Sequence, residues 1–477
     1  MPESAGKNLG EAVASPTKKF FVEMLTRDIE LQDAILDLLD NCLDGVSRTV
    51  GHPTDDQRPY RGFRATIRLD PDRFEISDNC GGIPLEVARD RAFALGRPPE
   101  IGQEELATIG MYGIGMKRAI FKLGADATVQ SDHDQPFEVR IDPNWMKSED
   151  WSPLPIKSIP ADALPGHGTK IIVTALRREA AASLKDPVWI DAFRTVVRRH
   201  YALIIDKGFE VVIGTSAEVD GGIDPLKGLP FRLLSALNGA DEPAIAPIIY
   251  QGEVEGVRVE IYAGMWRPLL SPEEIEQEED GRASADEAGW TVACNDRVVI
   301  WKDKTRLTGW GDGNVPNYHG QFISITGLVL LTAERPLDLP LTTTKRGIDA
   351  ASNVYLNVKE LMREATKTLA TFTNRWKKFP EQRETLYRTS KSLGLDELRS
   401  FAESAPLTPL RRISTVKRYE PVLPVPPQAK KGVRVSFSAE KDEVELLGRF
   451  FYDDPTAKPD QVGRAAFDAA LEVARAQ

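Results

Sequence analysis

Residues 31–45, LQDAILDLLDNCLDG, place apolar residues at helical spacing beside a row of acidic and amide side chains. This periodicity predicts an amphipathic helix that begins at Leu31 and that Gly45 ends. Asp37 and Asn41 then lie on one face of the helix, about one turn apart. An amide oxygen suits Mg²⁺, and a carboxylate one turn away can orient and deprotonate a water molecule. The competing interpretation is an ordinary helix with a solvated polar face.

A second motif, ISDNCGGIP at residues 76–84, follows two segments that alternate like strands, RATIRLD and RFEISD. A strand that ends in a glycine turn allows the backbone to approach a ligand closely. At such a strand end the Asp78 carboxylate can accept a hydrogen bond from an adenine amino group. The alternative is a plain Asp-Asn-Gly turn.

A third motif, GMYGIGMK at residues 110–117, leads into a predicted helix. The free N–H groups of a helix start bind phosphates, and Lys117 adds positive charge. Arg118 follows Lys117 where a P-loop has Ser or Thr, and the spacing of the glycines also differs from a Rossmann fingerprint. On its own, a glycine-rich loop is a weak signal.

A fourth motif, GHGT at residues 166–169, is a turn that leads into the strand-like run TKIIVTAL. Thr169 can reach an adenine edge directly or through water. The alternative is the ordinary start of a strand.

The order and spacing of the four motifs resemble the GHKL superfamily, which includes gyrase B, MutL, MORC, the heat-shock chaperone ATPases and the histidine kinases. The resemblance covers about residues 17–180, and the opening of this segment looks most like MutL- and MORC-like proteins. It implies an α+β chain with an N-terminal Bergerat α/β sandwich that binds ATP and Mg²⁺, with a lid from Pro84 to Gly110. The implied metal ligand is Asn41, and Asp37 is the implied catalytic carboxylate. The implied nucleotide-binding residues are Asn41, Asp78, Gly82, Ile83, Gly110, Gly113, Gly115, Met116, Lys117 and Thr169.

Two residues depart from the family pattern. Most hydrolysing members have Glu where this chain has Asp37. Because Asp is one methylene shorter, we expect slow hydrolysis. Cys80 replaces the usual first glycine of the adenine motif, either as a small packed residue or as a site that makes binding sensitive to oxidation.

A second block of strand-like segments resembles the transducer domain of MutL and MORC proteins. Residues 290–301, WTVACNDRVVIW, carry an Asn-x-Arg turn from Asn295 to Arg297. Further on, PLTTTKRGID at residues 340–349 offers Lys345, or alternatively Arg346, as the cation that the resemblance places on the γ-phosphate. Such a cation stabilises charge on the transferred phosphoryl group and reports that it is present. An exposed basic loop is the alternative. An ATP domain that comes first argues against a histidine kinase.

The motifs and the composition along the chain together predict six segments. They are a flexible arm (1–18), the GHKL ATP-binding domain (19–182), a transducer-like domain (183–352), a helical segment (353–402), a proline-rich basic linker (403–432) and a small C-terminal unit (433–477).

The C-terminal unit resembles a ribbon-helix-helix module. VRVSFS at residues 433–438 alternates like a strand, and two helix-like runs follow it. Residues 411–438, rich in Lys and Arg, would then contact double-stranded DNA, with Arg434, Ser436 and Ser438 facing bases or phosphates. The alternative is a small helical docking unit behind a charged linker.

Composition limits the functional classes. The net charge of −11 argues against a surface covered in nucleic acid but allows a local basic patch. Three cysteines without CxxC spacing indicate neither a disulfide framework nor a zinc site, and favour a cytoplasmic protein. No apolar run is long enough to cross a membrane. The resemblance to MutL and MORC proteins implies an ATP-gated homodimeric clamp that acts on DNA; the alternatives are a chaperone-like ATPase and a nucleotide-binding switch without turnover.

Overall fold

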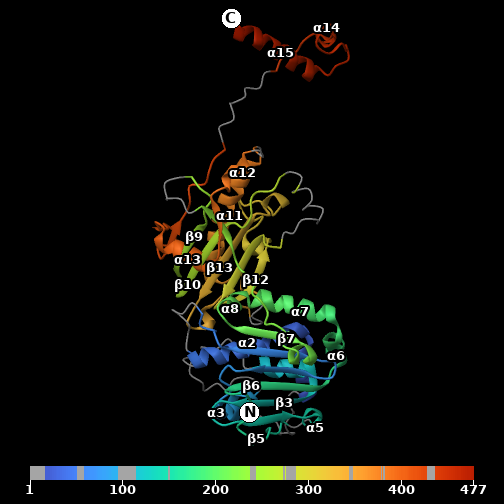
Figure 1. Cartoon of the computed structure of the whole chain (residues 1–477), viewed down its shortest axis with the longest axis vertical. Helices are drawn as coiled ribbons and strands as arrows, with labels where there is room; N and C mark the ends of the chain where they lie inside the picture. The colour runs from blue at the N-terminus through green and yellow to red at the C-terminus, as the bar shows by residue number, and fades with distance from the viewer. Residues whose placement is uncertain are drawn as a thin grey trace, which may run out of the picture. The chain divides into compact units, whose positions relative to one another are not determined.

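Two β-sheets, each packed against helices, organise the chain up to Val425, and a separate helical unit follows from Pro426 (Figure 1). The structure is a computed structural model. It describes residues 17–50, 58–94, 114–148, 151–236, 243–271, 274, 286–342, 347–377, 379, 382–426 and 436–476. The mixture of helices and mixed sheets confirms the α+β class.

The first sheet has the strand order β5-β4-β3-β6-β2-β1-β7 in the described part of the chain. Its strands are β1 (Arg64–Leu69), β2 (Phe74–Asp78), β3 (Gly124–Asp132), β4 (Phe137–Ile141), β5 (Ile156–Ser158), β6 (Gly168–Leu176) and β7 (Glu210–Gly214). Neighbouring strands are antiparallel, except that β1 and β7 are parallel. The antiparallel pairing of β2 with β6 brings two of the predicted motifs together at one end of the sheet.

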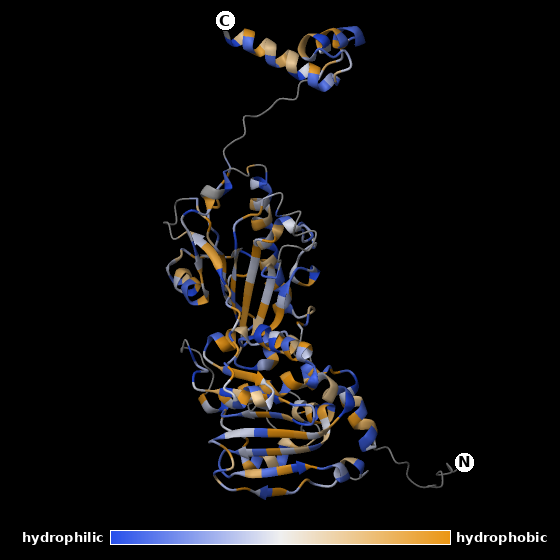
Figure 2. Ribbon diagram, turned by 45° about the vertical axis from the view of Figure 1, so that its right-hand side comes forward, coloured by the Kyte–Doolittle hydropathy of each residue, from blue (hydrophilic) through white to orange (hydrophobic). Residues whose placement is uncertain are grey.

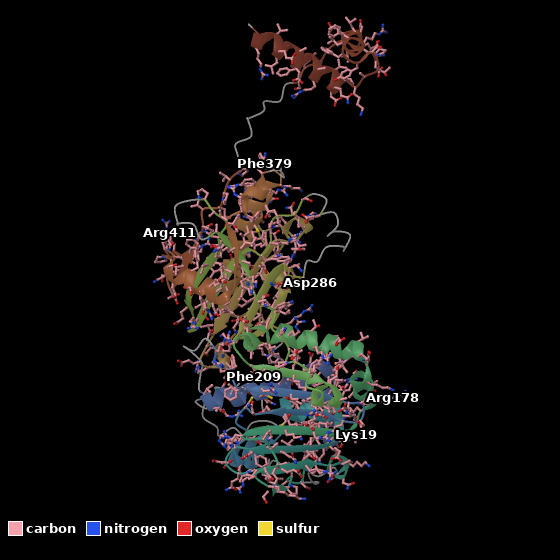
Figure 3. The ribbon with its side chains drawn as sticks, viewed as in Figure 1. Lys19, Arg178, Phe209, Asp286, Phe379 and Arg411 are labelled. Carbon is pink, nitrogen blue, oxygen red and sulfur yellow. The ribbon has the colours of Figure 1, made fainter. Side chains whose placement is uncertain are left out.

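One face of this sheet is apolar, because buried and partly exposed residues alternate along β1 and β4. The colours of the ribbon alternate accordingly in Figure 2. Helices α1 (Lys18–Arg27), α2 (Leu31–Val50) and α4 (Gly115–Leu123) contribute to the same core, which also contains Phe209, labelled in Figure 3. The result is a two-layer α/β sandwich.

Further helices surround this core. They are α3 (Leu85–Val87), η1 (Ala88–Ala92), α5 (Pro143–Lys147), α6 (Arg178–Lys185), α7 (Pro187–His200), α8 (Ala202–Asp206) and α9 (Ser216–Asp220).

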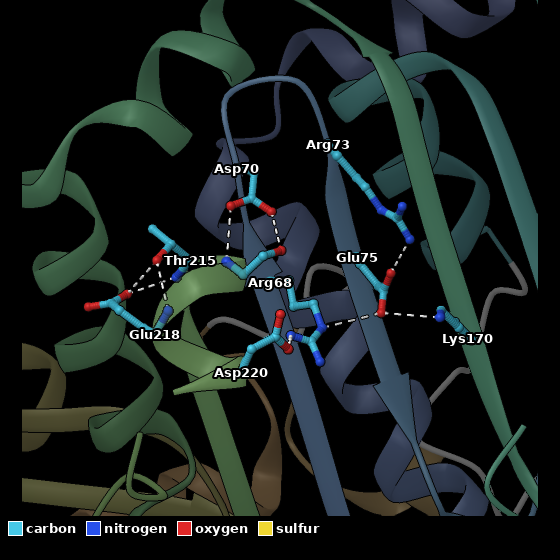
Figure 4. A network of polar contacts seen from close by, with 9 residues as sticks. Arg68, Asp70, Arg73, Glu75, Lys170, Thr215, Glu218 and Asp220 are labelled. Carbon is cyan, nitrogen blue, oxygen red and sulfur yellow. Dashed lines mark hydrogen bonds and ion pairs between the residues drawn. The ribbon is translucent and has the colours of Figure 1, made fainter. Parts of the chain in front are cut away.

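A polar network lies across β1, β2 and β6, as Figure 4 shows. Glu75 forms ion pairs with Arg68 at 3.5 Å, with Lys170 at 3.4 Å and with Arg73. Arg68 also pairs with Asp220 of α9 at 2.9 Å. Three cations surround the buried Glu75 carboxylate and compensate for its desolvation.

The second sheet has the described strand order β12-β11-β13-β10-β9-β16-β15. Its strands are β9 (Ile248–Val254), β10 (Val257–Met265), β11 (Gly289–Cys294), β12 (Arg297–Asp303), β13 (Ile325–Thr332), β15 (Thr408–Pro409) and β16 (Val416–Tyr419). Both faces are covered, since nearly every residue of β10, β11 and β13 is buried. Helix α11 (Asn353–Trp376) packs on one face. The core on the other face includes α13 (Leu395–Ser404) and the strand pair β8 (Leu233–Ala236) and β14 (Ser390–Leu393).

Short 3₁₀ turns complete this half: η3 (Arg306–Thr308), η4 (Gly320–Phe322) and η5 (Pro336–Asp338). The unit from Pro426 contains α14 (Lys441–Tyr452) and α15 (Pro459–Ala476), which contact each other.

Several segments differ from the sequence-based expectation. Helix α2 continues past Gly45 to Val50. Within the helical segment expected at residues 353–402, α12 is limited to Arg383–Leu386, and Ser390–Leu393 form a strand instead. The expected linker carries β15 and β16, which join the second sheet. Of the strand expected at 433–438, residues 433–435 lie outside the described part, and Ser436 and Ser438 belong to no strand.

Candidate functional site

Helix α2 carries the carboxylate and amide of the first motif. Asp37 is 8% exposed and Asn41 is half-buried, four residues further along the same helix. The Asp37 carboxylate forms an ion pair with Arg118 of α4. A Cβ added to Gly115 would lie 3.5 Å from the Asp37 Cβ, so the start of α4 lies against this side chain.

The start of α4 contains the last three residues of the glycine-rich motif. Gly115 and Met116 are half-buried, while Lys117 is buried and donates hydrogen bonds to the carbonyls of Ala92 at 2.9 Å and Ala94 at 2.6 Å. Burial lowers the pKa of Lys117 to about 8. The Lys117 ammonium therefore holds the end of η1 in this structure. Gly110 and Gly113 lie outside the described residues.

The end of β2 holds the carboxylate of the second motif. Asp78 Oδ1 accepts hydrogen bonds from the backbone N–H groups of Cys80 at 2.8 Å and Thr169 at 3.4 Å. The Cys42 thiol of α2 donates to Oδ2 at 3.5 Å. Desolvation raises the pKa of Asp78, and these hydrogen bonds oppose the rise. The structure thus joins the second and fourth motifs through one carboxylate.

Two glycines allow close approach around Asp78. Gly82 has φ +68°, and a Cβ there would lie 2.1 Å from the Asp132 carbonyl. A Cβ on Gly45 would lie 2.4 Å from the Cys80 carbonyl, which explains why glycine stands inside α2. Helix α2 therefore lies directly against the turn that follows Asp78.

A serine that the sequence did not single out connects the remaining residues. Ser131 Oγ accepts a hydrogen bond from the N–H of Ile83 at 2.7 Å and lies 3.2 Å from Thr169 Oγ1. The second and fourth motifs are thereby joined a second time. The alternation along β3 was visible in the sequence, but nothing in it assigned Ser131 this role.

Cys42 and Arg118 were also missed as site residues. Cys42 directly follows Asn41, so the sequence could have placed it beside the first motif. Its role as a hydrogen-bond donor could not be predicted, because its acceptor, Asp78, is distant in the sequence. Burial and the Asp78 charge raise the pKa of the Cys42 thiol, which keeps it protonated as a donor. Arg118 directly follows Lys117. The sequence motif assigned the phosphate contact to Lys117, because Lys is a common phosphate ligand, and left Arg118 without a role.

The arrangement has two chemically distinct ends. Around Asp78, a desolvated carboxylate, a thiol and a hydroxyl can bind the edge of a heterocycle through hydrogen bonds. Around Asn41, an amide oxygen, a carboxylate and the amino-terminal end of α4 can bind an anion together with a hard cation. These groups suit a nucleotide that extends from one end to the other.

The second sheet contacts α2 through the hairpin between β11 and β12. Arg297 Nε donates to Asp40 Oδ1 at 2.7 Å, and the Tyr201 hydroxyl donates to the same oxygen at 2.5 Å. Asp296 in the turn pairs with Lys207 at 2.5 Å. The Asn-x-Arg turn predicted from sequence thus joins the second sheet to α2 and to the segment around α8. Lys345 and its alternative Arg346 lie outside the described residues.

Comparison with known families identifies the first sandwich. Residues 29–165 match the family described as "Histidine kinase-, DNA gyrase B-, and HSP90-like ATPase". No curated protein matches the chain. In the part of the chain that the structure describes, no helix is both long and apolar enough to cross a bilayer. The matched range contains α2, Asp78 and the start of α4, so the chain carries an ATP-binding domain of the GHKL superfamily.

Proposed function

We propose that the N-terminal domain binds Mg-ATP and hydrolyses it slowly. The observation that carries the proposal is the position of Asp37 and Asn41 on one face of α2, within the range that matches the ATPase family and beside the start of α4. In this proposal Asp78 accepts a hydrogen bond from the adenine amino group. Gly82, Ile83 and Thr169 surround the base.

Asn41 is the proposed Mg²⁺ ligand. Its amide oxygen is a hard neutral donor, and the half-buried side chain is accessible to a ligand. In the described residues no cluster of three His, Cys, Asp or Glu side chains forms a separate cage for a metal. Mg²⁺ is commonly held by one or two protein oxygens together with phosphates and water. Bound Mg²⁺ would neutralise phosphate charge.

The other phosphate contacts come from backbone and lysine groups. Gly115 and Met116 offer the amino-terminal N–H groups of α4, and Gly110, Gly113 and Lys117 complete the predicted set. Lys345 is the proposed γ-phosphate cation, with Arg346 as the alternative. These assignments extend the family resemblance to this chain residue by residue.

Hydrolysis in this proposal depends on Asp37. Asp37 orients a water molecule and accepts its proton while the water oxygen attacks the γ-phosphorus. The bond between the γ-phosphorus and the bridging oxygen breaks, and ADP and phosphate leave. Asp37 carries one methylene less than the usual glutamate, which would place the carboxylate further from the water and slow the reaction.

We further propose that ATP brings two copies of the chain together as a clamp on double-stranded DNA. The buried contact between Asp40 and Arg297 supports a mechanical connection between the nucleotide helix and the second sheet. Exposed Arg411 and Arg412 support a DNA contact within residues 411–438. Three free, buried cysteines support the expected cytoplasmic location.

One observation favours a second candidate, a nucleotide-binding switch without turnover. The Asp37 carboxylate already has a cationic partner in Arg118. A carboxylate held in this ion pair is less available to a water molecule.

Phosphate release from Mg-ATP tests the proposal. We expect slow release by the wild-type chain, and loss of at least about a hundredfold in both Asp37→Asn and Asn41→Ala, within the usual range for removing a general base or a charge-stabilising group. Asp33→Asn is the matched control, because Asp33 lies one turn earlier on α2 and should be dispensable. Stimulation by double-stranded DNA would support the clamp.

The other outcomes discriminate between the candidates. Tight ATP binding without phosphate release would support the second candidate, a nucleotide-binding switch without turnover. Release that persists in Asp37→Asn would remove Asp37 from catalysis. Release that DNA does not change would count against the clamp and favour a chaperone-like ATPase.

A further inference from the structure

Arg118 is the cation that lies against the proposed catalytic carboxylate. Its Nη2 forms the ion pair with Asp37 Oδ2, and the side chains are 19% and 9% exposed. The Arg118 Nε is buried and has no hydrogen-bond partner among the described residues. A buried guanidinium N–H without an acceptor is costly. Its position therefore points to an acceptor that a ligand supplies.

The surroundings of Arg118 suit a phosphate. Arg118 lies in the first turn of α4, whose amino-terminal N–H groups attract anions. The start of this helix lies against Asp37, because a Cβ added to Gly115 would lie 3.5 Å from the Asp37 Cβ. Asn41, the proposed Mg²⁺ ligand, is one turn further along α2. The terminal phosphate of a bound nucleotide is the group that should reach this point.

Lys117, which the proposed function also places on the phosphates, is bound to two backbone carbonyls in this structure. Lys117 is 3% exposed, and its ammonium is bound to the carbonyls of Ala92 and Ala94. Arg118 is the next residue on the same turn and already faces Asp37. The planar guanidinium can bind carboxylate or phosphate oxygens with the same fork of N–H donors.

We propose that Arg118 is a positioning residue that exchanges Asp37 for the terminal phosphate of ATP. This inference rests on the proposed function. Without nucleotide, or with ADP bound, Arg118 stays in the ion pair with the Asp37 carboxylate. The γ-phosphate draws the guanidinium away, and Asp37 becomes available to orient water. The chain thereby couples the availability of its base to the presence of the group to be cleaved.

The exchange makes Arg118 a determinant of the choice between ATP and ADP. ADP lacks the phosphate that competes with Asp37, so its affinity should depend little on Arg118. Affinity for a β,γ-imido analogue of ATP should depend on it strongly, because a charge-assisted contact to phosphate is lost.

Equilibrium binding of ADP and of the β,γ-imido analogue, both with Mg²⁺, tests this directly. In Arg118→Ala we expect the analogue affinity to fall about tenfold and the ADP affinity to change less than about threefold, as removal of one charge-assisted hydrogen bond predicts. Arg118→Lys should recover part of the loss. Lys122→Ala is the matched control, since Lys122 lies one turn later on α4 and donates to the Thr26 carbonyl.

A second variant tests the exchange from the other side. Asp37→Asn removes the carboxylate that competes with the γ-phosphate for Arg118, so Arg118 can bind the phosphate without breaking an ion pair. We expect this variant to bind the analogue more tightly than the wild type does, with ADP affinity nearly unchanged. The result is informative even if Arg118→Ala does not fold.

The outcomes separate this inference from the proposed function. A wild-type chain that binds neither nucleotide would contradict the proposed function itself. If the wild type binds both, but Arg118→Ala weakens both equally or neither, Arg118 only holds α4 and α2 together. Unchanged analogue binding in Asp37→Asn would also overturn the exchange.

Discussion

Arg297 of β12 donates a hydrogen bond to Asp40 of α2 at 2.7 Å, and both side chains are almost completely buried. Asp40 stands directly before Asn41 and three residues after Asp37, so the second sheet is tied to the helix that carries the proposed reaction. Burial by itself would lower the pKa of Arg297, but its interactions with the Asp40 carboxylate and the Tyr201 hydroxyl raise it above its usual value. This buried ion pair holds α2 in position.

Arg297→Met should destabilise the chain strongly, because it leaves the Asp40 charge buried without its cation. The expected loss is about 3 to 5 kcal/mol of unfolding free energy. Chemical denaturation followed by tryptophan fluorescence measures it. Arg140→Met is the control, since the Arg140 side chain is 59% exposed and loss of its pair with Asp126 should leave the midpoint almost unchanged. A midpoint for Arg297→Met equal to that of the control would show that the contact contributes nothing.

His200 should make the same contact sensitive to acid. Its Nδ1 lies 2.7 Å from the Val298 carbonyl, and burial together with the Arg297 charge lowers the pKa of His200 below 6.5. As the pH falls below 6.5, the unfolded chain takes up the proton before the folded chain does, so the free energy of unfolding decreases.

Denaturation midpoints at several pH values between 7 and 5 test this, with His200→Asn as the comparison. The wild type should lose more stability over this range than His200→Asn does. Parallel pH profiles would mean that His200 titrates equally in both states.

Gly45→Ala should destabilise the chain although alanine favours helices. A new Cβ would lie 2.4 Å from the Cys80 carbonyl, so α2 or the turn after Asp78 must move. We expect a loss of about 1 to 3 kcal/mol, the usual cost of overpacking, and weaker ATP binding. Thermal unfolding and nucleotide titration measure the two effects.

Gly463→Ala is the matched control for Gly45→Ala. Gly463 is also inside a helix, α15, and its added Cβ meets no atom within 4 Å. Helix propensity alone then applies, and the change should stabilise the helix by about 1 kcal/mol. Equal effects at the two glycines would mean that the close approach at Gly45 has no energetic consequence.

Periodicity made much of the first sandwich predictable. The helical spacing from Leu31 placed Asp37 and Asn41 on one face, and the alternation in RATIRLD and RFEISD predicted β1 and β2. These patterns depend only on neighbouring residues, so they predict the helix and the strands in any fold that buries the apolar face. The end of the helix was predicted wrongly, because a glycine usually marks a stop and here it permits contact with Cys80.

The long-range contacts could not be predicted from the sequence, because no local pattern encodes them. Arg118 reaches Asp37 across 81 residues, and Arg297 reaches Asp40 across 257. Strand β14 pairs with β8, although its sequence was assigned to a helix. Partners so distant are chosen by tertiary packing, which can override local propensity.

The central proposal is that Asp78 recognises adenine, and the contribution of this residue to nucleotide affinity can be measured directly. Equilibrium titration with Mg-ATP and Mg-GTP, for the wild type and Asp78→Asn, measures it. We expect the wild type to prefer ATP, and Asp78→Asn to lose at least about tenfold in ATP affinity and most of the preference, because the acceptor for the amino group is gone. ATP affinity that is unchanged in Asp78→Asn, or a wild type that binds GTP equally well, would contradict the site described here.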